Sequence, residues 1–175
     1  SINTARFDTT KHLATPVISD AKVGLEQLSE VLGDWKAPKE WFERAVKERN
    51  EWDAYVEKQS GPTNQETPSY AQAVGAVYRN ADPSDIVVTA AGGLVGEVVQ
   101  IWKPKQLNTF ETEWGFSCMG YEISGALGIK MAKPDQEVVV FIGDGSYLLH
   151  NSDIYSSVIY DKKLIIVVCD NGGHM

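Results

Sequence analysis

The sequence has few cysteines, few basic residues and no long apolar run, and each shortage excludes a class of protein. Only two of its 175 residues are cysteine, too few for the disulfide framework of a small secreted domain. Lysine and arginine number 16 against 24 acidic residues, for a net charge of −8, whereas non-specific nucleic-acid binding needs a basic surface. No stretch approaches the ~18 apolar residues of a membrane span. We therefore expect a cytoplasmic protein without nucleic-acid or membrane partners.

Three apolar stretches in the second half of the chain each end in glycines or polar residues. Val138–Ile142 runs into Gly143-Asp-Gly145, Leu164–Cys169 runs into Asp170-Asn-Gly-Gly173, and the β-branched stretch 86–90 runs into Ala91-Gly-Gly93. Such apolar stretches are typical of buried strands. If the strands are parallel neighbours, their polar ends lie at one carboxyl edge of a sheet, where open α/β sheets bind ligands.

The polar ends of these stretches suggest a metal-bridged diphosphate. Asp144 offers a carboxylate and Asn171 an amide oxygen, and Mg²⁺ prefers oxygen ligands combined with substrate phosphates. Gly143 and Gly145 allow close backbone approach. The amides of Gly145 and Ser146 open the next helix, and a helix N-terminus binds anions.

Each of these motifs also has a simpler interpretation. Gly-Asp-Gly alone is more often a surface turn, and the glycines after Ala91 could form a plain tight turn. Met119 could be an ordinary core residue. His150 could serve as an acid or base because the pKa of histidine lies near neutrality, but a supporting role behind the site or a surface role is favoured. Glu97 is expected to be a solvated helix residue.

The amino-acid sequences of five segments resemble those of the thiamine-diphosphate enzyme family. They resemble in particular the branch of the family that acts on a cyclic dione in myo-inositol breakdown. The resemblance covers nearly the whole chain and is most specific from 86 to 173. The segments are Thr89-Ala-Ala-Gly-Gly-Leu94, Trp114-Gly-Phe-Ser-Cys-Met-Gly-Tyr-Glu122, Gly143-Asp-Gly-Ser-Tyr147, Asn151-Ser-Asp-Ile-Tyr155 and Cys169-Asp-Asn-Gly-Gly173.

This resemblance implies roles for individual residues. Asp144, Asn171 and the carbonyl of Gly173 would hold Mg²⁺, and Met119 would lie under thiamine diphosphate and bend its two rings toward each other. The other implied cofactor contacts are Ala91, Gly92, Gly93, Ser117, Cys118, Gly143, Gly145 and Ser146. The glutamate that activates the cofactor in this family would come from another domain, so no catalytic residue is assigned in this chain.

The predicted fold class is α/β, a three-layer arrangement around a mostly parallel sheet, as in the thiamine-diphosphate-binding fold. We expect residues 1–33 to be the helical tail of a central domain and 34–67 a helical linker. Residues 68–175 would form the diphosphate-binding domain, incomplete at its C-terminal side. Three tryptophans near the linker, Trp35, Trp41 and Trp52, are expected to be packing anchors rather than a stacking platform.

For function, the resemblance implies Mg²⁺- and thiamine-diphosphate-dependent hydrolysis of a C–C bond in trihydroxycyclohexane-1,2-dione, giving 5-deoxy-glucuronate. It also implies a homo-oligomer with its active site at a subunit interface, so that this chain alone would be inactive. One alternative is a related carboligase of the acetolactate-synthase type, or a decarboxylase. Another is a non-enzymatic diphosphate-binding module.

Overall fold

The chain divides into two units, and the division lies within a long helix. The structure, a computed structural model, describes residues 1–113 and 115–173. The first unit is Ser1–Arg49 and the second is Asn50–Met175, while helix α3 runs over Lys39–Ser60. The last turns of α3, from Asn50 onward, belong to the second unit. From the sequence, the whole of α3 is expected to lie in the linker 34–67.

The first unit combines two short parallel strands with a capped helix. Strands β1 (Ile2–Asn3) and β2 (Val17–Ile18) pair, and helix α2 covers Ala21–Leu32. Asp20 starts α2 because its carboxylate accepts hydrogen bonds from two backbone amides of the first turn. Gly33, with φ at 52°, ends the helix, as its sequence position predicts. The short helices here are α1 (Arg6–Thr9) and the 3-10 helix η1 (Lys11–Leu13).

A four-stranded parallel sheet forms the centre of the second unit. Its strand order is β4-β3-β5-β6, with β3 at Ile86–Thr89, β4 at Phe110–Thr112, β5 at Val138–Gly143 and β6 at Ile165–Cys169. Every pair is parallel, so the strands end at one edge. The predicted α/β class with a parallel sheet is confirmed.

Side chains that alternate along the strands build a core on each face of the sheet. On one face, Val87, Val139 and Phe141 pack with helices α4 (Tyr70–Asn80) and α5 (Gly93–Ile101). Val56, near the end of α3, joins this core, and Arg79 donates a 2.7 Å hydrogen bond to the carbonyl of Ser60. The end of α3 is therefore held by contacts within the second unit.

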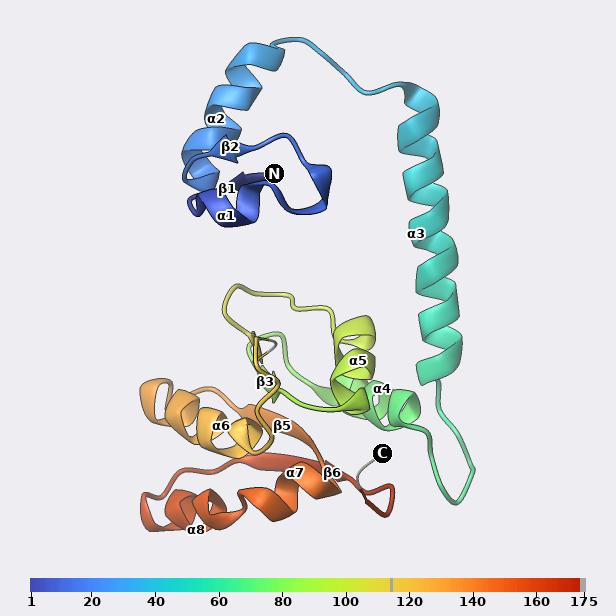
Figure 1. Ribbon diagram of the computed structural model, residues 1–175. Coiled ribbons are helices and arrows are strands. Elements are labelled where there is room, and N and C mark those ends of the chain that lie inside the picture. The colour runs from blue at the N-terminus through green and yellow to red at the C-terminus, as the bar shows by residue number, and fades with distance from the viewer. Residues whose placement is uncertain (114, 174–175) are drawn as a thin grey trace. The chain divides into compact units, whose positions relative to one another are not determined.

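The opposite face of the sheet is covered by the remaining helices. Ile86, Val88 and Val140 pack there with Ile123 of helix α6 (Tyr121–Ala132). Helices α7 (Asp144–Leu149) and α8 (Ser152–Ile159) lie on the same side (Figure 1). The second unit therefore has three layers, helices on both faces of one sheet.

Two local predictions need correction. The sequence that follows Ser146 predicts a single helix over 147–160, but the structure breaks it between α7 and α8, because His150 leaves the helical conformation (φ −146°, ψ 51°). The three tryptophans expected to anchor packing are 46–68% exposed, and Trp52 instead stacks on Tyr55 at 5.6 Å.

Within the described ranges, no helix has the length and apolar character needed to cross a membrane.

Candidate cofactor site

Residues from the ends of three neighbouring strands line one cavity at the carboxyl edge of the sheet. Its volume is about 300 Å³, and it is bordered by the segments that follow β3, β5 and β6. The lining residues are Tyr70, Ala91, Gly92, Gly93, Leu94, Met119, Gly143, Asp144, Gly145, Ser146, Asn171 and Gly173. The structure thus brings together most of the residues singled out in the sequence; Ser117 and Cys118 are not part of this lining.

Two helices begin at this cavity without a side-chain cap. Helix α7 starts at Asp144 after an extended Gly143, and no side chain accepts from its first-turn amides. Helix α5 starts at Gly93, and its N-cap Gly92 has φ at 79°, a conformation that glycine adopts without strain. First-turn amides have no carbonyl partner inside their own helix. Two sets of such amides therefore border the same space, which suits a ligand with negative charge.

The loop after β6 brings Asn171 and Gly173 to the same cavity. The side-chain oxygen of Asn171 accepts a 3.2 Å hydrogen bond from the amide of Gly173, and Asp170 accepts one of 2.8 Å from the amide of Gly172. Both glycines have positive φ, 85° and 146°. The loop is thus a tight turn held by its own side chains, and it places Asn171 and Gly173 in the cavity that Asp144 lines.

Tyr70 is a lining residue that the sequence analysis missed. Burial raises the pKa of its hydroxyl above the usual 10.0, and the neighbouring Cys169 and Asp144 raise it further, while a hydrogen bond with the Asn171 side chain lowers it. The phenol therefore stays protonated at neutral pH beside two of the predicted metal ligands. Tyr70 is the first residue of α4 and lies far from any glycine-rich motif in the sequence. No local sequence pattern therefore predicts that it lines the cavity.

Comparison with known families shows what this part of the chain resembles. Residues 90–175 match the family model described as "Thiamine pyrophosphate enzyme, C-terminal TPP binding domain". Residues 90–175 are therefore similar to the TPP-binding domain of thiamine pyrophosphate enzymes. Every cavity-lining residue except Tyr70 lies within the matched range.

Curated relatives extend the similarity over the rest of the chain. The chain is 33% identical to the 3D-(3,5/4)-trihydroxycyclohexane-1,2-dione hydrolase of Geobacillus thermodenitrificans, 35% to that of Lacticaseibacillus casei and 34% to that of Clostridium tetani. Each alignment covers 99% of this chain but only 30–31% of the relative. The chain thus spans about 30% of the length of these relatives.

The residues present suit the cofactor of this family. Asp144, Asn171 and Gly173 all line this cavity, and these residues carry a carboxylate, a side-chain amide oxygen and a backbone carbonyl. Across residues 1–113 and 115–173, no three His, Cys, Asp or Glu side chains form a cluster able to hold a metal by themselves. A cation here would need further oxygens from a ligand, which matches the way Mg²⁺ is held between carboxylates and phosphates.

The loop that carries Met119 is organised by Glu113. The Glu113 carboxylate accepts 2.8 Å hydrogen bonds from the amides of Phe116 and Cys118, and these bonds lower the pKa of the Glu113 carboxyl. Ser117 and Cys118 are exposed on this loop. Met119 is half exposed and lines the cavity, whereas Trp114 lies outside the described residues.

Glu122 is the second residue that the sequence analysis missed. Its side chain is fully buried, and its two oxygens accept hydrogen bonds from the amides of Ala91 (3.2 Å) and Gly120 (2.9 Å). Glu122 lies within one of the motifs that carry the family resemblance. Its hydrogen bond with Ala91, 31 positions away, could not be predicted from the local sequence.

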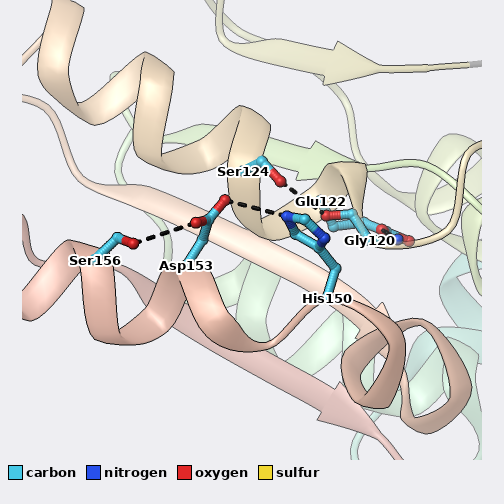
Figure 2. A network of polar contacts seen from close by, with 6 residues as sticks. All are labelled: Gly120, Glu122, Ser124, His150, Asp153 and Ser156. Atoms are coloured by element: carbon cyan, nitrogen blue, oxygen red, sulfur yellow. Dashed lines mark hydrogen bonds and ion pairs between the residues drawn. The ribbon is translucent and has the colours of Figure 1, made fainter.

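His150 lies beside this group without lining the cavity. Its ring nitrogen Nε2 is 3.2 Å from Asp153, and Ser156 donates to the same carboxylate at 3.2 Å. Figure 2 shows His150 facing the start of α6 at Gly120 and Glu122. The position of His150 beside the Gly120 turn, outside the cavity lining, favours a supporting or surface role over a role in acid–base chemistry.

Proposed function

We propose that this chain forms the diphosphate- and metal-holding part of a thiamine-diphosphate site in a hydrolase of C–C bonds. The observation that carries the proposal is the single cavity shared by Asp144, Asn171, Gly173 and two uncapped helix N-termini. Asp144 and Asn171 would bind Mg²⁺ through side-chain oxygens and Gly173 through its carbonyl. The amides of Gly145 and Ser146 would donate to the diphosphate.

The remaining walls would shape and shield the cofactor. Thiamine diphosphate, when bound, would supply a nucleophilic carbon, and its thiazolium ring would take up the electrons of the cleaved C–C bond. Met119 gives an apolar, unbranched side chain that fills irregular space and would support the cofactor rings. Ala91, Gly92 and Gly93 would permit close approach of the backbone to the cofactor, and Ser117 and Cys118 would contact it from the neighbouring loop.

We propose trihydroxycyclohexane-1,2-dione as the substrate, with 5-deoxy-glucuronate as the product. The support is the shared name of the relatives, whose identity of 33–35% extends over 99% of the chain. The test is to assay the purified full-length protein, with Mg²⁺ and thiamine diphosphate, on the cyclic dione and on pyruvate. We expect turnover of the dione alone. Turnover of pyruvate instead would identify a carboligase or decarboxylase, and binding without turnover of either would favour a non-enzymatic module.

We further propose that the active site is completed by another part of the protein, at a subunit interface of a cytoplasmic homo-oligomer. Several large apolar side chains of α8 and the following turn are 58–72% exposed, namely Tyr155, Val158, Ile159 and Tyr160, which suits a surface that is covered in an assembly. Both cysteines are free thiols, as suits a reducing compartment. Turnover of the dione by the isolated 175-residue chain, or a monomeric full-length protein in light scattering, would contradict this proposal.

A further inference from the structure

A buried carboxylate connects two walls of the cofactor cavity. Glu122 is fully buried in the first turn of α6. One of its oxygens accepts from the amide of Ala91, a lining residue that follows β3, and the other accepts from the amide of Gly120, which follows the lining residue Met119. A single side chain thus bonds the backbone of one wall and the backbone next to the other.

The Gly120 turn is held from three directions at once. Glu122 binds its amide, and the hydroxyl of Ser124 donates to its carbonyl at 3.3 Å. On the third side, a Cβ placed on Gly120 would lie 2.3 Å from the Cβ of His150, so the histidine packs directly against the glycine. These residues surround the turn in Figure 2. The position of Met119, one residue earlier, is thereby set by groups that do not themselves line the cavity.

We propose that Glu122 is a positioning residue that sets the separation between the Ala91 wall and the Met119 wall of the cofactor cavity. The inference rests on the proposed function, since it assigns Glu122 a part in binding thiamine diphosphate. The geometry favours a carboxylate, because each of the two amides bonds a different oxygen of Glu122, and a side-chain amide would present an NH₂ donor in place of one of these acceptors.

Replacing Glu122 with glutamine tests this requirement with almost no change of shape. In Glu122→Gln one of the two amides faces an NH₂ group and loses its acceptor, and a buried donor left without a partner is costly. In the full-length protein we expect the affinity for thiamine diphosphate, measured by calorimetry with Mg²⁺, to fall about tenfold or more. We also expect faster hydrogen exchange at the amides of Ala91 and Gly120.

Two further variants separate positioning from general stability. Glu97→Gln makes the same substitution on α5, at a side chain that does not line the cavity, and should leave affinity and exchange unchanged. Ile123→Ala removes a fully buried neighbour on α6 and should lower the melting temperature, with affinity retained at temperatures where the variant is folded. If Glu122→Gln does not fold, Glu122→Asp keeps the charge but is one methylene shorter, and should show the same loss of affinity.

The possible results distinguish this inference from the proposed function. If the unaltered full-length protein does not bind thiamine diphosphate, the proposed function fails, and the role of Glu122 fails with it. If the unaltered protein binds but the Glu122 variant that folds binds within twofold of it, the inference alone is overturned. An equal loss of affinity in Ile123→Ala would also overturn it, because stability would then explain the effect.

Discussion

The backbone of Gly120 lies directly against the side chain of His150, with only 2.3 Å between the His150 Cβ and the point where a Cβ of residue 120 would be. Gly120 also has φ at 94°, a conformation that costs other residues roughly 1–2 kcal/mol. Gly120→Ala should therefore destabilise the second unit by more than this, because the histidine must move as well. The measurement is the free energy of unfolding in denaturant.

Gly128, on the same helix α6, is the matched control for this substitution. Apart from its chain neighbours and the backbone of its own helix, no atom lies within 4 Å of the Cβ that Gly128→Ala would add, and alanine favours the helical state. We expect this variant to gain roughly 0.5–1 kcal/mol. Equal effects at both glycines would show that the contact with His150 does not constrain the turn.

Acidification should loosen the loop before Met119 through Glu113. The amides of Phe116 and then Cys118 lower the pKa of this carboxyl below 4.5. A carboxyl with a lowered folded-state pKa stabilises the loop above its unfolded pKa, and the contribution disappears as pH falls through the lowered value. An NMR titration should therefore show the Phe116 and Cys118 amide shifts moving with a midpoint below 4.5.

Two variants serve as references for this titration. Glu113→Gln should abolish the movement of the two amide signals, whereas Glu111→Gln, a nearby exposed glutamate, should preserve it. A midpoint at or above 4.5, or a titration that persists in Glu113→Gln, would assign the signals to another group.

Removing the Tyr70 hydroxyl should weaken metal-dependent cofactor binding. Tyr70 lines the cavity and hydrogen-bonds with the Asn171 side chain, so Tyr70→Phe leaves that amide less well oriented. A hydrogen bond of this kind contributes ~0.5–1.5 kcal/mol, and we expect a few-fold loss of affinity in calorimetry with Mg²⁺. Tyr78→Phe, on the same helix but away from this cavity, is the control. If Tyr70→Phe binds the cofactor with unaltered affinity, Tyr70 has no part in cofactor binding.

The contribution of Tyr70 to cofactor binding should not change with pH near neutrality. Its pKa is raised, chiefly by burial, so the neutral phenol persists beyond pH 10.0 and its favourable contribution is lost only as pH rises through the raised value. A Tyr70-dependent change in cofactor affinity between pH 7 and 9 would contradict this account.

The sheet was predictable because its strands are continuous apolar runs, as expected for parallel strands buried on both faces. The observed β5, Val138–Gly143, and β6, Ile165–Cys169, lie where those runs are. The break between α7 and α8 was not predictable. His150 leaves the helix where it packs against Gly120, and a contact between two segments so far apart has no signature in helical periodicity.

The site was predictable to the extent that its residues follow strands. Asp144 and Asn171 come directly after β5 and β6, and a parallel sheet must place both at one edge. Tyr70 and Glu122 act through contacts across the fold, with Asn171 and with Ala91. Only the folded structure reveals such contacts, since either residue type at those positions is compatible with an ordinary helix start.

The most direct test of the cofactor site is calorimetric titration of the full-length protein with thiamine diphosphate, with and without Mg²⁺, beside Asp144→Ala. Asp135→Ala, at an exposed turn before β5, is the control. The account predicts Mg²⁺-dependent binding that is kept in Asp135→Ala and lost in Asp144→Ala. Binding that depends on neither Mg²⁺ nor Asp144 would contradict the assignment of this cavity as the metal and diphosphate site.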